Sequence, residues 1–374
     1  MSITITLSRP TDITTRAIKN AGAGHPLILP LLEWLAYMAP TGFPKQVFFQ
    51  FSALLPVKLA EAGRETWIRL FDELERHRLV IHSRQDLYLF GPVLSSLRRG
   101  IRARRASSIV RQAGRLLLAT FPESGKPAIT RDELNRLSWH ARALAEHAMN
   151  VGDRETAGQL MHWLDRSGRL LIGPWPDRAI NCHQSALLLS QRLLGSDNPL
   201  TIIRLNNLGE TWRRLKEPLQ AERCLMRALY LLERSRQRNP RLEANILGNI
   251  GLLRIDQQRL EEAHATFGMA WSLARTTRGL DDPLVFLSVN NLARIMIRRN
   301  DLDEVIDLLQ KALEQHDRVN PDTPHLNVAI ILNNLARVQK KLGHAAEAEN
   351  TLKLARDTAR HFLPKDHPLF TEDP

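Results

Sequence analysis

The sequence predicts an all-helical protein in which stacked helix pairs follow a small, basic helical head. Two observations carry this prediction. An asparagine followed by an apolar and a small residue recurs at positions 207, 249, 291 and 334, so successive copies differ by 42, 42 and 43 residues. A fixed period between about 20 and 50 residues indicates a stacked-repeat architecture. The second observation is charge, because basic residues are concentrated before the repeats begin.

The first part of the chain is strongly basic. Residues 1–130 contain 18 Lys and Arg against 9 Asp and Glu, a net charge of +9 out of +12 for the whole chain. We therefore expect four segments along the sequence. These are a poorly ordered segment at 1–24, a basic domain at 25–125, a repeat solenoid at 130–365 and a tail at 366–374.

The repeats are expected in a regular order. A helix at 131–149 stacks first, and residues 156–179 resemble a repeat helix that lacks the asparagine phrase. Further units begin near 177 (second helix only), 201, 243 and 285, and a last unit covers 326–362. Each unit has a first helix with the asparagine phrase, a polar turn, and a second helix with small residues seven apart, such as Ala221 and Ala228. Most units end in a proline-containing loop, because proline cannot continue a helix.

The head has a less regular pattern. It predicts, in order along the chain, a helix, a proline-containing turn, a second helix, a pair of short strands at 79–83 and 87–91, and another helix. The most apolar stretch, around residues 25–40, is too short to cross a bilayer and contains Pro30 and Glu33. We expect a buried helix there.

The repeat pattern resembles a known family. Leu208, Gly209, Ala221 and Ala228, closed by proline, stand at the offsets of a tetratricopeptide repeat. The 42-residue length and the "LNNLA" wording are similar to the long repeats of kinesin light chains and of bacterial signalling proteins. This resemblance implies a right-handed helical solenoid that binds other proteins.

The head resembles a second known region. The phrase "LLEWLAYMAPTGFP" before a strand pair, with 42-residue repeats after it, is similar to the winged-helix region of NB-ARC-type (STAND) signalling ATPases. Such an ATPase needs a Gly-x4-Gly-Lys-Ser/Thr loop for phosphate. The Gly125-Lys126-Pro127 segment lacks the earlier glycine and the hydroxyl, so the resemblance carries no ATPase activity to this chain.

Other chemistry is not indicated by the sequence. The thirteen histidines show no His-Glu-x-x-His pattern, and His140 and His147 stand seven apart on one helical face. Cys182 and Cys224 are 42 residues apart and match no zinc pattern, so we expect buried thiols. There is no secretory signal pattern. We therefore expect a non-enzymatic cytoplasmic protein without catalytic residues, cofactors, metal sites or membrane association.

The repeats suggest a peptide-binding groove. In such units the fifth, ninth, twelfth and thirteenth residues of the first helix are expected to face the groove. The predicted groove residues are Asn206, Arg213, Asn290, Arg294, Arg298, Asn333, Arg337 and Lys341. Arg214 and Lys340 also occupy positions that are expected to face the groove. Gly248, Leu252 and Ile255 of the intervening unit would form an apolar floor.

The chemistry of this groove predicts its ligand. Asparagine amides can donate hydrogen bonds to an extended peptide backbone and accept them from it, and arginine binds carboxylates through two parallel hydrogen bonds. The predicted ligand is therefore an extended acidic peptide with an apolar or aromatic anchor, although these side chains could also simply be solvated. The asparagine at the sixth position recurs in all four units, so we expect it to bond to an adjacent helix or turn.

The head contains a second candidate site. Seven arginines lie between residues 97 and 115, and the predicted anion-binding residues are Arg98, Arg99, Arg102, Arg104 and Arg105. A solvated or domain-docking surface, a protein partner and nucleic acid all remain open for them. The main functional prediction is an adaptor or sensor that binds a protein partner. The alternatives are a DNA-binding regulator with a basic head and a fragment of a signalling ATPase, and the sequence does not define the oligomeric state.

Overall fold

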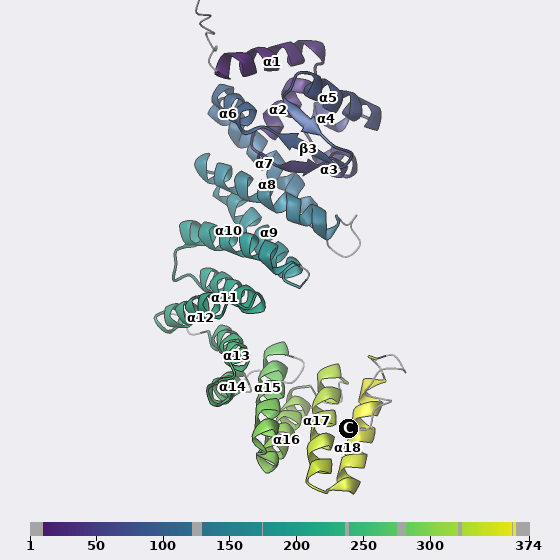
Figure 1. Cartoon of the computed structure of the whole chain (residues 1–374), viewed down its shortest axis with the longest axis vertical. Coiled ribbons are helices and arrows are strands. Elements are labelled where there is room, and N and C mark those ends of the chain that lie inside the picture. Colours follow the sequence, from purple (N-terminus) through teal and green to yellow (C-terminus); the bar gives the residue numbers. More distant parts are fainter. Residues whose placement is uncertain are drawn as a thin grey trace, which may run out of the picture. The chain divides into compact units, whose positions relative to one another are not determined.

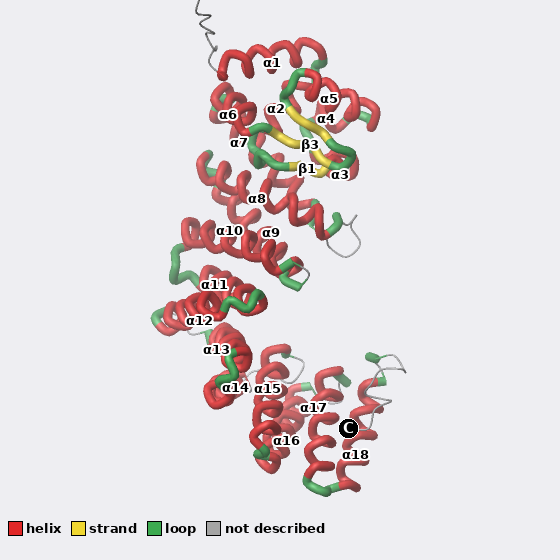
Figure 2. Tube along the Cα trace, viewed as in Figure 1, coloured by secondary structure: helices red, strands yellow, loops and turns green. Residues whose placement is uncertain are grey.

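The computed structural model describes residues 10–121, 129–173, 175–235, 239–274, 282–320, 324–360 and 362–363. The chain divides into two compact units, residues 1–196 and 197–374. Both are predominantly helical, as predicted, and the strands form one small sheet (Figure 2). The Gly125 segment and the predicted tail at 366–374 lie outside the described residues.

The first unit begins with a mixed head domain. Its elements are α1 (Pro10–Gly24), α2 (Ile28–Leu35), β1 (Gly42–Pro44), α3 (Lys45–Gln50), a 3-10 turn (Ser52–Leu54), α4 (Val57–Ala60), α5 (Arg64–Arg76), β2 (Val80–His82), β3 (Asp86–Leu89), α6 (Gly91–Gly100) and α7 (Ala103–Ala119). The predicted strand pair is confirmed as β2 and β3, which pair antiparallel with Ile81 opposite Tyr88. The sheet order is β1-β3-β2.

Two features of the head differ from the prediction. The segment 1–24 was expected to be poorly ordered, but residues 10–24 form α1, whose Ala21 is fully buried. The polar composition of this helix concealed it. Strand β1 was not predicted either, because Gly42 and Pro44 in a three-residue strand give no alternation of apolar and polar residues.

The head is built on an aromatic core. Trp34 of α2 meets Phe43 of β1 edge-on at 5.6 Å between ring centroids, and Phe48 of α3 lies 4.9 Å from Trp67 of α5. All four rings are at most 1% exposed. The edge-to-face contact of Trp34 with Phe43 adds stabilisation beyond the apolar area that the two rings bury. The core therefore fixes the short elements, which are too small to be stable alone.

Three longer helices complete the first unit, namely α8 (Arg131–Asn150), α9 (Arg154–Leu171) and α10 (Pro176–Leu194). Helix α8 starts with a capping box in which the Thr130 hydroxyl accepts from the Glu133 amide and the Glu133 carboxylate accepts from the Thr130 amide. Helix α9 packs on α8 and α10 packs on α9 (Figure 1). The predicted stacking of the 131–149 helix on the next helix is therefore confirmed.

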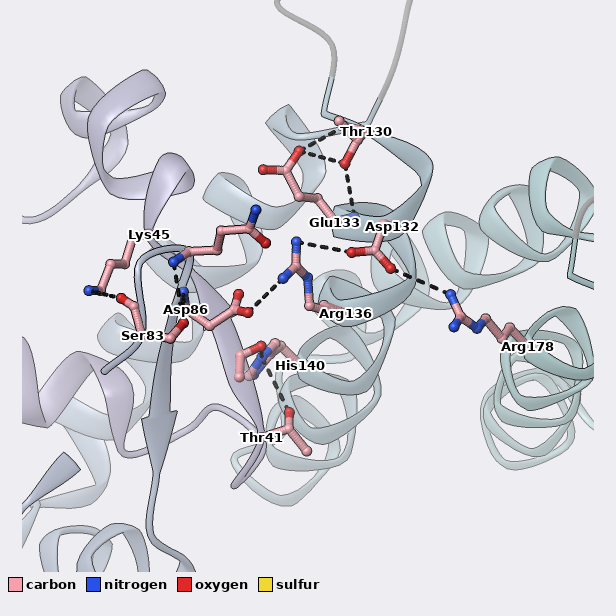
Figure 3. A network of polar contacts seen from close by, with 12 residues as sticks. Thr41, Lys45, Ser83, Asp86, Thr130, Asp132, Glu133, Arg136, His140 and Arg178 are labelled. Atoms are coloured by element: carbon pink, nitrogen blue, oxygen red, sulfur yellow. Dashed lines mark hydrogen bonds and ion pairs between the residues drawn. The ribbon is translucent and has the colours of Figure 1, made fainter. Parts of the chain in front are cut away.

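Helix α8 is joined to the sheet by polar contacts (Figure 3). Arg136 forms ion pairs with Asp86 of β3 at 2.6 Å and with Asp132 at 3.3 Å. His140 is fully buried, and its Nδ1 accepts a hydrogen bond from the Ala39 amide at 3.1 Å. Its Nε2 lies 3.1 Å from the Gly42 carbonyl, which accepts from it. This arrangement requires a neutral ring, because a proton on Nδ1 would face another donor.

The second unit consists of four helix pairs. They are α11 (Pro199–Arg214) with α12 (Pro218–Glu233), α13 (Pro240–Asp256) with α14 (Leu260–Ala274), α15 (Pro283–Arg299) with α16 (Leu302–Val319), and α17 (Leu326–Lys341) with α18 (Ala345–Ala359). Pro199 and Pro240 each take the first helical position, where a missing amide costs nothing, and Asn198 and Asn239 cap their helices.

The turn between the two helices has an equivalent backbone conformation in all four pairs. Lys216, Gln258, Asn300 and Gly343 all have positive φ, between 61° and 83°, and they follow the same period as the asparagines. This left-handed residue reverses the chain between the two helices of a pair. The turn geometry therefore repeats even though its sequence varies.

Small residues let the paired helices approach closely. A Cβ added at Gly209 would lie 2.7 Å from Leu225, and one added at Gly251 would lie 2.7 Å from Phe267 of the following helix. The equivalent residues in the last two pairs are Ala293 and Ala336, both fully buried. The small residue of the repeated phrase is thus the contact point of each helix pair, and the units form a solenoid-like arrangement.

The buried histidine generates a prediction on stability. Burial lowers the pKa of His140 to about 4, although the Gly42 hydrogen bond acts in the opposite direction. Between about pH 6.5 and pH 4 the unfolded chain binds the proton and the folded chain does not, so the free energy of unfolding falls as the pH falls through this window. We expect a loss of up to about 3 kcal/mol, at 1.36 kcal/mol per pKa unit.

Urea unfolding followed by tryptophan fluorescence at several pH values measures this loss. The His140→Gln variant cannot titrate there, so its stability should fall less than that of the unaltered protein over the same window. His344→Gln is the control, because that side chain is 51% exposed. An identical pH dependence in the unaltered protein and His140→Gln would contradict the assignment.

Candidate peptide-binding groove

The first helices of the four pairs, α11, α13, α15 and α17, contact one another in succession. Because the repeat interval is fixed, equivalent residues of neighbouring first helices lie near each other. The predicted groove positions are all on these helices. Their surroundings decide which of them remain open to a ligand.

Two of the four repeated asparagines, Asn249 and Asn334, form hydrogen bonds between neighbouring repeats. The Asn249 amide of α13 donates to the Asn206 side-chain oxygen of α11 at 3.0 Å, and Asn206 donates in turn to Asn245 at 3.1 Å. The same contact recurs two repeats later, where Asn334 donates to Asn290 at 3.0 Å. A sixth-position asparagine thus bonds to the fifth-position asparagine of the preceding repeat. We name this set of contacts the asparagine ladder.

The ladder confirms the structural role predicted for the sixth-position asparagine at Asn249 and Asn334. Asn291 differs in detail, since its amide donates to the Leu287 carbonyl of its own helix and its oxygen accepts from Arg294 at 3.3 Å. Its expected partner in the preceding repeat would be Gly248, which has no side chain. The exception therefore has a direct cause in the sequence.

The ladder also corrects part of the predicted groove. Asn206 is only 2% exposed and both ends of its amide are bonded within the ladder, so it does not present a free amide to a ligand. The oxygen of Asn290 is committed in the same way. Asn333 is half-buried and takes no part in the contacts of the ladder.

Four predicted residues converge on one hollow between α15 and α17. Arg294, Arg298, Arg337 and Lys341 line a cavity of about 220 Å³ together with Ile297, Asn334 and Val338. All four cationic side chains are exposed, and Val338 is fully buried at the base. We name this the basic hollow. Its chemistry combines positive charge at the rim with an apolar base.

The basic hollow contains no acidic side chain in its lining. Within the described ranges, Arg298, Arg337 and Lys341 have no carboxylate partner, and Arg294 contacts only the neutral amide of Asn291. Four positive charges are thus held close together on the exposed surface of α15 and α17. Such an arrangement raises the local affinity for anionic groups.

A larger hollow of about 710 Å³ lies beside it and shares Arg298. Arg213, Arg214 and Ile255 also line this hollow, so the predicted apolar floor is represented by Ile255. Gly248 is buried, and Leu252 packs against the apolar core. Two successive hollows therefore extend across the first helices.

Sequence reasoning missed six residues of the larger hollow, namely Lys216, Pro218, Leu253, Asp256, Gln257 and Gln258, and the acidic one among them changes its charge. Asp256 forms an ion pair with Arg213 at 2.6 Å, and the Arg213 side chain is only 15% exposed. Arg214 is paired with Glu210 of its own helix at 2.9 Å. Asp256 occupies the thirteenth position of its repeat, so its acidic character was visible in the sequence. The larger hollow is therefore less cationic than the basic hollow.

The predicted arginines of the head separate into two groups. Arg98 is half-buried and donates to the Ala36 carbonyl, and Arg105 is paired with Glu33 at 2.8 Å. Arg99, Arg102 and Arg104 are exposed. These five residues therefore do not form one continuous anion-binding site.

The surroundings of the two cysteines keep them unreactive. Cys182 is buried and Cys224 is half-buried, and burial raises their thiol pKa values to about 12 and about 11. At neutral pH both are thiols, which are poor nucleophiles and poor metal ligands.

Among the described residues no group of three or more His, Cys, Asp or Glu side chains could hold a metal ion. No described helix is long and apolar enough to cross a membrane.

Comparisons with known proteins agree with this architecture. The tetratricopeptide repeat family model matches residues 176–234, 242–318 and 285–361, so these parts of the chain are tetratricopeptide repeats. Repeats of this kind are protein-interaction modules. No curated protein sequence matches the chain significantly.

Several solved structures are similar. BtubC (BKLC) from P. vanneervenii has 17% sequence identity and a TM-score of 0.52, over 64% of this chain and 96% of that one. The nearly identical TPR-like repeats described for a kinesin light chain of Podosopora anserina have 15% identity and a TM-score of 0.42, over 60% of this chain and 95% of that one. At this identity, the BtubC comparison supports a shared fold and nothing further.

A third similar structure is a signal transduction ATPase with numerous domains (STAND) with a tetratricopeptide repeat sensor, from Pyrococcus horikoshii. It has 12% identity and a TM-score of 0.37, over 89% of this chain. The chain covers 50% of that protein's length.

The asparagine ladder generates a prediction on stability. Replacing Asn249 with alanine leaves the buried oxygen of Asn206 without this donor, whereas the Asn245 oxygen still accepts from Asn206. An unsatisfied buried polar group costs about 1–3 kcal/mol, and we expect the free energy of unfolding to fall by that amount.

Denaturant unfolding of the Asn249→Ala variant measures the effect. Asn333→Ala is the matched control, because Asn333 belongs to the last repeat, and it should change the stability by less than about 0.5 kcal/mol. Equal losses in both variants would show that the ladder has no special role.

Proposed function

We propose that the repeats bind an extended acidic segment of a partner protein in the basic hollow. The observation that carries this proposal is the convergence of Arg294, Arg298, Arg337 and Lys341 without an acidic partner in the lining. Guanidinium groups bind carboxylates through two parallel hydrogen bonds. The half-buried Ile297 offers an apolar contact among these charges.

The dimensions of the two hollows favour an extended ligand. The basic hollow, at about 220 Å³, holds one or two side chains and not a compact domain. Because it shares Arg298 with the larger hollow, a bound segment can continue from α17 towards α13. Acidic side chains would contact the rim of the basic hollow. An apolar or aromatic anchor would enter the larger hollow beside Ile255.

We infer that the protein acts as an adaptor or sensor in a regulatory system and not as an enzyme. The head supports this inference through its order of elements, in which α5, β2 and β3 follow one another before α6. A helix followed by such a strand pair is the order that the resemblance to winged-helix regions of signalling proteins implied. The head would then transmit or localise the binding event that occurs on the repeats.

Charge reversal tests the proposed ligand. We expect the Arg294→Glu/Arg337→Glu variant to bind acidic peptides at least about tenfold more weakly, because the loss of a charged hydrogen bond of about 1.5 kcal/mol corresponds to that factor. The probes are arrayed short peptides rich in glutamate that carry a single leucine or tryptophan. Fluorescence anisotropy of the strongest binder then gives the dissociation constants.

The matched control is Arg223→Glu/Arg227→Glu, which makes the same change of charge on the exposed face of α12. It should bind as the unaltered protein does. If both double variants lose affinity equally, the attraction reflects net charge and not the basic hollow. If lysine-rich peptides bind as well as acidic ones, the proposed ligand class is wrong.

A further inference from the structure

Helix α7 of the first unit carries a second basic surface. Arg104, Arg111 and Arg115 line a hollow of about 480 Å³ together with Ser107, Ser108 and Gln112. Positions 104, 108, 111 and 115 follow one face of a helix, at the spacing i, i+4, i+7 and i+11. We name these six residues the α7 stripe. Only Arg104 belongs to the anion-binding residues predicted from the sequence.

The α7 stripe is held in place by the helices beneath it. Arg111 forms an ion pair with Asp153 at 3.2 Å, while its own side chain remains 57% exposed and that of Asp153 only 6%. Gly114 allows close contact with α9, since an added Cβ would lie 2.6 Å from Thr156. Arg111 is therefore positioned before any ligand arrives, and its exposed donors still point to solvent.

The remaining charges of the stripe are not neutralised. Within the part of the chain that the structure describes, Arg104 and Arg115 are exposed and have no acidic partner. From residue 91 to residue 121 the sequence contains seven arginines and no acidic residue. The stripe therefore keeps unneutralised positive charge at Arg104 and Arg115, on either side of the Arg111–Asp153 pair, which favours a polyanionic ligand.

The chemistry of the stripe selects among polyanions. Every side chain in its lining donates hydrogen bonds, and none is aromatic, apolar or acidic. A nucleotide bound as a compact ligand would lack a surface for its base. Phosphate oxygens, by contrast, are contacted in nucleic acids by arginine, serine and glutamine side chains together.

The length of the stripe indicates a row of phosphates. At 1.5 Å per residue, Arg104 and Arg115 are about 16 Å apart along the helix axis. Each strand of duplex DNA has a phosphate at about every 3.4 Å along the duplex axis, so several phosphates fall within that distance. A single phosphate could reach only one or two of the three arginines, so a chain of phosphates satisfies the stripe better.

We propose that the α7 stripe binds the phosphodiester backbone of duplex nucleic acid without reading its sequence. The contacts would be made by Arg104, Arg111 and Arg115, with the serine and glutamine side chains donating to intervening phosphate oxygens. This site is independent of the basic hollow, and its test does not depend on the peptide ligand.

Salt dependence of DNA binding by the full chain tests the proposal. The probes are two mixed-sequence DNA duplexes of equal length and, separately, inorganic polyphosphate. We expect the unaltered protein to bind both duplexes equally. In the Arg104→Ser/Arg111→Ser/Arg115→Ser variant, the slope of log affinity against log salt should decrease in magnitude by about 2.7, because each phosphate that an arginine neutralises contributes about 0.9 to the slope.

Two further variants make the result specific. Replacing the same three arginines by lysine keeps the charges and should retain most of the slope. Arg69→Ser/Arg142→Ser/Arg192→Ser removes three exposed arginines from α5, α8 and α10 and should retain the slope as well. An equal decrease in this control, no binding of duplex DNA at low salt, or binding of polyphosphate alone would each overturn the proposal.

Discussion

The contact between neighbouring first helices is the constraint on which the second unit depends. A sixth-position asparagine can reach the fifth-position asparagine of the preceding repeat only if the repeats keep one register, and Asn249 with Asn206 and Asn334 with Asn290 do so at 3.0 Å. The small residue two positions after the sixth-position asparagine sets the distance to the paired helix, as Gly209 and Gly251 show. The fixed interval between repeats therefore follows from two packing contacts, one between neighbouring first helices and one between the two helices of a pair.

This constraint also determines which side chains of the first helices remain open to solvent. The fifth-position amides of Asn206 and Asn290 are used by the ladder, so in these repeats the open side chains are those further along the first helices. Where the next repeat places an acid there, as Asp256 does beside Arg213, the charge is neutralised. Arg294, Arg298, Arg337 and Lys341 escape this neutralisation because no acid lies in the lining between α15 and α17. The repeated residues build the scaffold, and the varied residues give one part of it a positive charge.

Much of this could be predicted from the sequence, and the rest had physical reasons to remain hidden. The fixed repeat interval assigns each residue to a known face of its helix. The helix pairs, the role of Asn249 and the cations of the basic hollow could be predicted for this reason. The pairings of Arg105 with Glu33 and of Arg111 with Asp153 join residues far apart in the chain, so no local pattern reveals them. Helix α1 and strand β1 were missed because neither has a regular apolar pattern.

The most direct test of the central claim is hydrogen–deuterium exchange of the full chain with and without a bound acidic peptide. If the basic hollow is the recognition site, the peptide should slow exchange in α15 around residues 294–298 and in α17 around residues 337–341. Exchange in the second helices α12 and α16 should stay unchanged. Protection confined to those second helices, or to the head, would contradict the account and place recognition on another surface of the protein.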